Sequence, residues 1–175
     1  NSYWPTAVMY ARPVPNHPTK VAAIVTGHHG VPRMGELVVF DPALGRNEAE
    51  GAVRRIPGRG ERVEPVILDN LVDESWPKFL HPCPLSDKYF LVSCKPGPDK
   101  HWGVYLVDVF DNMLLLHEES GQAIFEPVPL RPTATPPVIP DRVKPGATEG
   151  TVYISDIYAG PGLRGVPRGA VKSLR

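Results

Sequence analysis

The sequence predicts an all-β fold, and three observations support this prediction. The chain of 175 residues contains 22 prolines and 16 glycines, and proline disrupts helices because its ring removes a hydrogen-bond donor and collides with the preceding turn. No segment carries apolar residues at helical spacing over the length of an ordinary helix. Instead, short runs of β-branched and aromatic residues are bounded by glycine and proline, which is typical of strands joined by turns.

The expected strands fall into three groups along the chain. The first group covers residues 21–26, 35–41 and 53–56, the second 88–93, 102–110 and 113–117, and the third 125–130, 151–158 and 170–174. Pro127 and Pro129 restrict residues 125–130 to the edge of a sheet, because proline cannot donate to a strand ladder. The many prolines between Pro127 and Pro145 predict an extended connector.

An internal repeat is visible when these strands are compared. Residues 21–41 and 89–108 both contain an apolar strand, a polar link and a second strand that ends in aspartate, and residues 151–174 form a looser third copy. Repeats of this kind are typical of β-propellers, which close with roughly four to eight blades. We therefore expect residues 1–175 to be a segment of a single β-propeller domain. Its blade-like repeats would lie near residues 21–64, 78–119 and 125–175, joined by Pro/Gly-rich connectors.

Charge and composition exclude several classes of function. Lysine plus arginine and aspartate plus glutamate both number 19, a balance that argues against a nucleic-acid-binding protein or a binder of anionic membranes. No run approaches the roughly 20 apolar residues that span a bilayer, so we expect no membrane insertion. The N-terminal residues show no signal peptide.

The two cysteines, Cys83 and Cys94, match no redox, haem-attachment or zinc pattern. Free cysteines are usually buried, so two packed thiols are one interpretation. A disulfide across adjacent strands is the other, if the compartment is oxidising.

His28 and His29, between Gly27 and Gly30, are the most chemically suggestive pair in the chain. In a glycine-flanked turn both imidazoles could converge as metal or haem ligands or as a proton-handling pair. The alternative is a β-turn in which an imidazole bonds to nearby backbone. No HExxH motif accompanies them, which argues against a self-contained zinc site.

Three aspartates, Asp41, Asp108 and Asp156, end corresponding strands of the repeat. Aspartate in this position usually caps the following turn by accepting backbone N–H groups. Calcium binding, with Asp111 and Asn112 as further oxygen ligands, is the alternative.

The remaining candidates define no complete active site. Aromatic residues could form a stacking platform or the blade core, and arginines form a basic loop that we expect to be solvated. These residues are Trp4, Trp76, Trp102, Tyr89, Tyr105 and Tyr158, and Arg54, Arg55, Arg59 and Arg62. Neither a phosphate-binding loop nor a GxSxG nucleophile elbow is present.

Several long runs resemble one known family. The runs are GHHGVPRMGELVVFDPALGR, WPKFLHPCPLSDKYFLVSCKP, WGVYLVDVFDNMLLL, LRPTATPPVIPDR and YAGPGLRGVPRGAVKSLR. They resemble the middle domain of hydrazine synthase alpha-subunit-like proteins, and the resemblance covers nearly the whole chain.

The resemblance implies a six-bladed β-propeller within a larger exported or periplasmic polypeptide. Haem c would be attached outside this segment, because the chain itself contains no CxxCH. The resemblance also suggests that a propeller tyrosine ligates haem iron, with Tyr158 as one candidate and plain turn packing as its alternative. The turn with His28 and His29 would then face the tunnel.

The function expected from these observations is that of a scaffold and interaction module. Its partners would be the remaining propeller blades and the cytochrome-type domains of the parent chain. One alternative is a direct contribution of His28 or His29, with a loop tyrosine, to a haem redox site of an oxidoreductase. Another is a propeller that binds glycan or protein through its aromatic residues.

Overall fold

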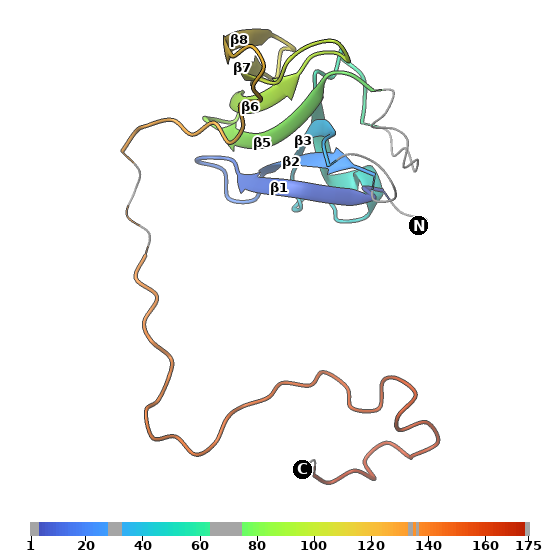
Figure 1. Ribbon diagram of the computed structural model, residues 1–175. Coiled ribbons are helices and arrows are strands. Elements are labelled where there is room, and N and C mark those ends of the chain that lie inside the picture. The colour runs from blue at the N-terminus through green and yellow to red at the C-terminus, as the bar shows by residue number, and fades with distance from the viewer. Residues whose placement is uncertain (1–3, 28–32, 64–74, 133–134, 136, 174–175) are drawn as a thin grey trace. The chain divides into compact units, whose positions relative to one another are not determined.

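The computed structural model describes residues 4–27, 33–63, 75–132, 135 and 137–173. The chain divides into two units, Asn1–Arg131 and Pro132–Arg175. All strands of the described residues lie in the first unit (Figure 1).

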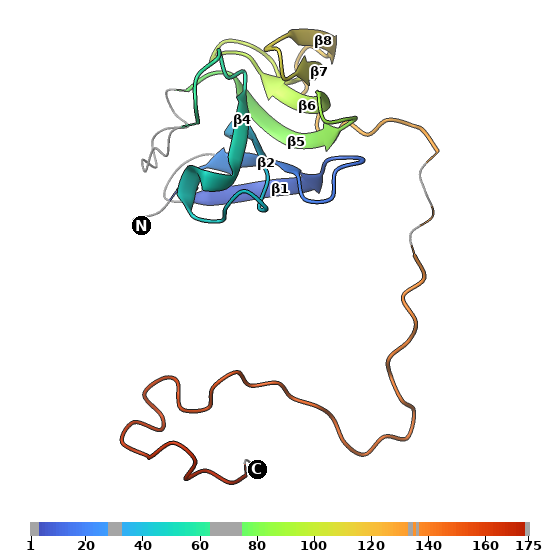
Figure 2. The same cartoon turned by 180° about the vertical axis from the view of Figure 1, so that it is seen from behind.

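Two antiparallel sheets of four strands each form the first unit. The first has the order β1-β2-β3-β4 and the second the order β5-β6-β7-β8 (Figures 1 and 2), so each sheet is a meander in which neighbours in sequence are neighbours in space. The strands of the first sheet are β1 (Ala7–Pro13), β2 (Val21–Thr26), β3 (Glu36–Phe40) and β4 (Ala52–Ile56), with a short 3-10 helix, η1 (Glu48–Gly51), before β4. Those of the second sheet are β5 (Lys78–Pro84), β6 (Tyr89–Lys95), β7 (Gly103–Asp108) and β8 (Met113–Glu118).

The main hydrophobic core lies between the two sheets. Alternation along each strand turns one set of side chains toward the facing sheet. The buried residues of this core are Val14, Ala22, Ile24, Leu37, Val39 and Ile56 from the first sheet and its loops, and Phe79, Phe90, Val92, Cys94, Tyr105 and Val107 from the second. Burial of each large apolar side chain contributes about 1.5–3 kcal/mol, so this interface holds the unit together.

A single backbone bridge joins the two sheets among the described residues. Gly35 and Phe79 form it: the N–H of Phe79 donates to the carbonyl of Gly35 at 2.8 Å, and the N–H of Gly35 donates to the carbonyl of Phe79 at 3.3 Å. A Cβ at Gly35 would collide with the carbonyl oxygen of Val25. Close approach of residue 35 to the backbone of β2 therefore requires glycine.

The six strands predicted for residues 21–56 and 88–117 are confirmed, with ends shifted by one or two residues. The strands β1 and β5 were not predicted from the sequence, because Pro13, Pro82 and Pro84 interrupt the apolar alternation. The all-β prediction is confirmed in this part of the chain.

The third group of predicted strands is wrong for the described residues. Residues 125–130, 151–158 and 170–173 form no strand. Pro127 and Pro129 remove two donors from the first of these segments. For residues 151–158, the described part of Pro132–Arg175 contains no neighbouring strand whose backbone could pair with them.

The second unit contains turns and one closed loop. Asp156 forms an ion pair with Arg168, with Oδ2 and Nη2 2.7 Å apart. The Tyr158 hydroxyl accepts the backbone N–H groups of Gly169 at 2.8 Å and Val171 at 3.1 Å. These contacts close residues 156–171 into a local loop. Across the described residues of both units, no helix has the length and apolar character required of a membrane span.

Candidate functional site

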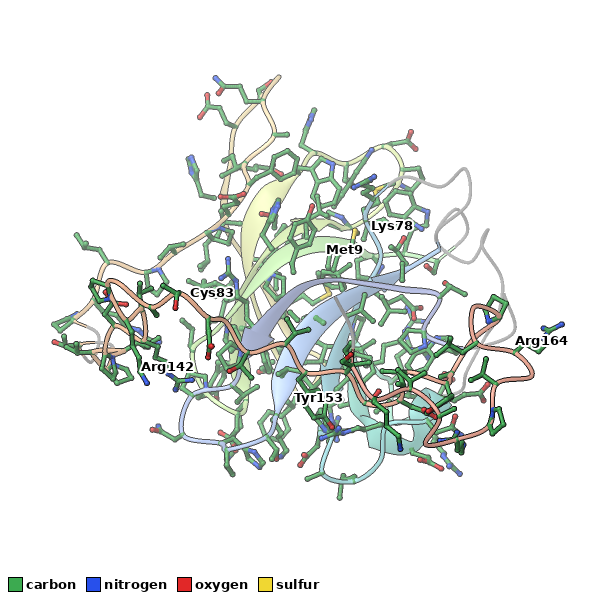
Figure 3. The ribbon with its side chains drawn as sticks, turned by 90° about the horizontal axis from the view of Figure 1, so that it is seen from below. Met9, Lys78, Cys83, Arg142, Tyr153 and Arg164 are labelled. Carbon is green, nitrogen blue, oxygen red and sulfur yellow. The ribbon has the colours of Figure 1, made fainter. Side chains whose placement is uncertain are left out.

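The first strands of the two sheets, β1 and β5, carry the same irregularity at the same place. The pairing register shifts between Met9 and Arg12 in β1 and between Leu80 and Cys83 in β5. Met9 and Cys83 are labelled in Figure 3. Within each shift one residue adopts a left-handed backbone, Tyr10 at a φ of 55° and His81 at 48°. Left-handed residues other than glycine are uncommon, and strain of this kind is often found at functional sites.

A third segment repeats this irregularity after β8. Glu126 has a φ of 57°, and it follows an apolar residue and precedes a proline, as His81 does. The segments at residues 9–14, 80–85 and 125–130 share a pattern of six positions. An apolar residue comes first and the left-handed residue second, followed by alanine or proline, any residue, proline, and finally valine or leucine. We call Tyr10, His81 and Glu126 the bulge triad.

The members of the bulge triad lie side by side. The rings of Tyr10 and His81 have centroids 4.4 Å apart, and Nε2 of His81 lies 3.8 Å from Oε1 of Glu126. Phe125 extends this row, since its ring lies 5.7 Å from His81 and 5.5 Å from Trp102. The three repeated segments therefore run next to one another, in chain order.

A cavity of about 300 Å³ opens beside the bulge triad. It is lined by Tyr10, Arg12, Pro13, His81, Pro82, Cys83, Pro84, Glu126, Pro127 and Val128. Nδ1 of His81 is buried without a hydrogen-bond partner, and its Nε2 is too far from Glu126 for an ordinary hydrogen bond. The imidazole thus carries unused hydrogen-bonding capacity where the three segments meet.

Part of the face of the second sheet that is turned away from the core is apolar and partly exposed. Leu91 pairs with Leu106, and Leu106 pairs with Leu114, so the three side chains share one face. Leu114 is 58% exposed, and Leu91 and Leu106 are partly buried. Val104, two residues before Leu106, belongs to the same face. We call these four residues the open face.

The first sheet is also apolar on the side away from the main core. Trp4, Val25, Val38 and Val63 form a second buried cluster there, with Phe40 packed against it. A neighbouring cavity of about 500 Å³ is lined mainly by apolar residues, including Val8, Val21 and Ala23. Both sheets therefore carry apolar surface outside the core that they share.

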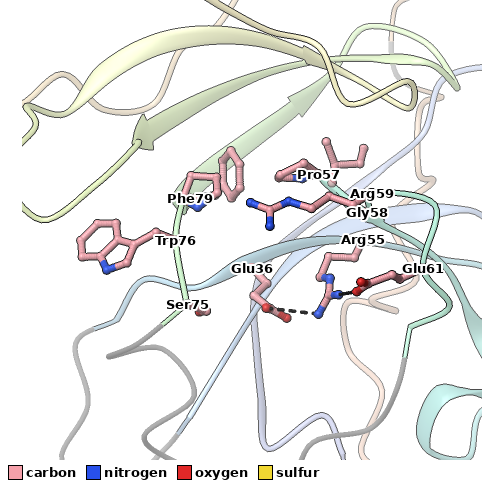
Figure 4. A pocket seen from close by; sticks show the side chains of 11 residues that line it. Glu36, Arg55, Pro57, Gly58, Arg59, Glu61, Ser75, Trp76 and Phe79 are labelled. Carbon is pink, nitrogen blue, oxygen red and sulfur yellow. Dashed lines mark hydrogen bonds and ion pairs between the residues drawn. The ribbon is translucent and has the colours of Figure 1, made fainter.

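A second cavity of about 300 Å³, which we call the junction pocket, lies where the two sheets meet (Figure 4). Its lining residues are Glu36, Arg55, Ile56, Pro57, Gly58, Arg59, Glu61, Ser75, Trp76, Pro77 and Phe79. Arg55 lies between two carboxylates, with Nη1 3.5 Å from Glu36 and Nη2 3.3 Å from Glu61. Burial raises the pKa of Glu36, against the opposing effects of Arg55 and Lys78.

The turn that carries Arg59 into the junction pocket is fixed by Asp111. One Asp111 carboxylate oxygen accepts the N–H of Gly58 and the other accepts the N–H of Arg59, both at 2.7 Å. Asp111 lies in the turn between β7 and β8, so the second sheet positions a turn of the first. The backbone of Arg59 is left-handed, with a φ of 50°.

The histidines singled out in the sequence, His28 and His29, lie outside the described residues. Tyr158 is placed, and its hydroxyl anchors the loop of the second unit through Gly169 and Val171. Its role as an iron ligand stays a prediction.

The thiols of this chain do not fit covalent attachment of haem c. Cys83 and Cys94 are both free and belong to neighbouring strands rather than to one CxxCH segment. Cys94 is fully buried in the core, and burial raises its thiol pKa strongly.

The predicted turn-capping role of the repeated aspartates is confirmed. Asp41 Oδ1 accepts the N–H of Ala43 at 3.1 Å, and Asp156 Oδ1 accepts that of Tyr158 at 2.9 Å. Asp108 accepts from the backbone of Phe110 at 2.8 Å and of Asn112 at 3.0 Å.

Sequence reasoning missed the bulge triad and the junction pocket. The repeated apolar–x–Ala/Pro–x–Pro pattern was a usable signal for the triad, although its prolines argued against strands. The basic loop was expected to be solvated, whereas Arg55 is only partly exposed and pairs with two acids. The sequence alone does not predict that Ser75 and Trp76 lie near Glu36.

Comparisons of this chain with protein-family models, with curated proteins and with solved structures found no match.

Proposed function

We propose that this chain forms consecutive blades of a β-propeller that serves as a scaffold and interaction module in a larger exported protein. The two sheets would be complete blades, and residues 125–130, which form no strand in this chain, would lie where a third blade begins. The observation that carries this proposal is the bulge triad. The left-handed residues of the repeated segments 9–14, 80–85 and 125–130 lie next to one another, as expected if these segments begin successive blades around a common axis.

The arrangement of the sheets supports the same proposal. A propeller stacks four-stranded meanders around a channel, and both sheets have this strand order. The open face of the second sheet is a surface on which a following blade could pack, as the second sheet packs on the first. Exposed apolar surface on a sheet is an aggregation hazard unless a partner covers it.

The module would act by binding and positioning other parts of its protein. The family resemblance is the reason to expect that those parts include further blades and cytochrome-type domains with haem c. The reaction of the parent protein would then take place at groups that this segment positions and does not itself hold.

A charge on the open face tests the blade proposal. In the natively produced polypeptide that contains this segment, Leu114→Glu should lower the unfolding midpoint and the folded yield, because a following blade would bury the carboxylate. In the isolated chain of 175 residues the same substitution should change stability by only about 0.5 kcal/mol. Thermal unfolding and the yield of soluble protein measure both effects.

Leu44→Glu is the matched control, because Leu44 is 67% exposed in a turn away from the open face. If Leu114→Glu and Leu44→Glu behave alike in the native polypeptide, no blade covers the open face and the proposal fails. Intact mass with visible absorbance tests the parent protein separately. A native mass near 19.2 kDa without a Soret band would refute the haem-bearing parent.

A further inference from the structure

The junction pocket has features of a ligand site that the scaffold function does not use. Its volume of about 300 Å³ lies at the lower end of the range for small-molecule sites, roughly 300–1,000 Å³. That space suits one sugar ring or a molecule of similar size. Strands supply four of its lining residues, Glu36, Arg55, Ile56 and Phe79, and the segments that follow β4 and precede β5 supply the others.

One cation in the pocket is available for an external anion. Arg55 is engaged by Glu36 and Glu61, whereas Arg59 has no acidic partner among the described residues. In Figure 4 the Arg59 guanidinium points into the space between Glu36, Trp76 and Phe79. Guanidinium groups bind carboxylates in paired, charge-assisted hydrogen bonds.

The neighbourhood of Trp76 adds further positive charge. The ammonium groups of Lys78 and Lys95 lie 4.8 Å and 5.7 Å from the centre of its ring. Arg55, Arg59 and Lys95 together carry one more charge than Glu36 and Glu61, which makes an anionic ligand more favourable than a cationic one.

Two groups in the pocket are suited to hydroxyls. Oγ of Ser75 is buried without a hydrogen-bond partner, a state that is costly unless a ligand or water satisfies it. The Glu36 carboxyl, whose side chain is 13% exposed, offers acceptor oxygens at the wall of the cavity. An apolar ring acid would leave Ser75 Oγ unpaired, and sites built around buried polar groups discriminate against such ligands.

We propose that the junction pocket binds a monosaccharide that carries a carboxylate, of the uronic acid type. Arg59 pairs with the carboxylate, Ser75 and Glu36 bond to ring hydroxyls, and Trp76 packs against the sugar ring. Asp111 is a positioning residue, because it holds the Gly58–Arg59 turn through two backbone N–H groups. The inference does not depend on the proposed blade assembly.

Titration of the full chain with D-glucuronate, followed by calorimetry and tryptophan fluorescence, tests this proposal. We expect saturable binding, weakened about tenfold or more in Arg59→Gln, because a charge-assisted pair is lost. Arg62→Gln is the matched control: it removes the same charge from an exposed residue three positions along the chain that does not line the pocket. Its affinity should equal that of the unaltered chain.

Two further ligands separate the parts of the proposal. D-glucose, which lacks the carboxylate, and benzoate, which lacks the hydroxyls, should each bind at least about tenfold more weakly than D-glucuronate. The proposal is overturned if D-glucuronate does not bind, if either analogue binds equally well, or if Arg59→Gln and Arg62→Gln have equal affinity. Far-UV circular dichroism of both variants verifies that they fold, since both side chains are exposed.

Discussion

Single residues explain how this chain turns between its strands. Asp41 and Asp108 each accept backbone N–H groups in the turn that follows their strand. Both aspartates have a pKa below the ordinary value of 3.8. The main cause is a side-chain hydrogen bond, which Thr19 donates to Asp41 and Asn112 donates to Asp108. The folded state therefore favours the ionised form of both carboxyls.

The sign of these pKa shifts predicts acid destabilisation. Because the pKa is lower in the folded state, the stabilisation is complete above the unfolded-state value of about 3.9 and is lost as pH falls through the folded-state value. We expect the urea midpoint of the chain to fall with pH in this range. In Asp108→Asn the fall should be smaller, because one linked proton is removed.

Burial raises the pKa of Glu36, a shift of the opposite sign. The quantity to measure is therefore the difference in pH dependence between the unaltered chain and Asp108→Asn. Urea unfolding at a series of pH values from neutral to about pH 3 spans the relevant window. Equal pH dependence in the unaltered chain and in Asp108→Asn would contradict the linkage assigned to Asp108.

At the scale of elements, the contact of β3 with β5 depends on one glycine. Gly35→Ala would place a methyl group against the carbonyl oxygen of Val25 and disturb the bridge to Phe79. Backbone shifts forced by overpacking cost about 1–3 kcal/mol. We therefore expect a clear loss of stability in chemical unfolding.

Gly97→Ala is the control for that substitution, because its added Cβ meets only the side chain of Lys100 at an ordinary 3.7 Å. Its stability should differ from that of the unaltered chain by about 0.5 kcal/mol or less. If both alanine variants unfold at the same denaturant concentration, close packing at Gly35 does not couple the sheets.

At the scale of the whole molecule, residues Asn1–Arg131 contain both sheets and their shared core. A chain that ends at Arg131 should therefore retain the β-sheet circular dichroism spectrum and an unfolding free energy within about 0.5 kcal/mol of the longer chain. Equilibrium urea unfolding of the two chains checks this expectation. Loss of cooperative unfolding in the shorter chain would show that the described core is insufficient for folding.

The sequence determined the strands whose apolar alternation is uninterrupted, together with the aspartates that cap their turns. These features are local: a strand with period-two burial and an aspartate that bonds two residues onward depend on neighbours in the chain. The same reasoning failed for β1 and β5, where prolines interrupt the pattern, and for residues 151–158, whose β-branched composition cannot supply a pairing partner.

Only the tertiary structure decided where the candidate sites lie. Tyr10, His81 and Glu126 come from three separate repeats, and they meet because the register shifts of β1 and β5 place them side by side. The junction pocket combines the start of β3, the end of β4 and the segment before β5. Residues so distant in sequence come into contact because of the way the sheets pack. The alternation and turn residues of a single strand do not specify that packing.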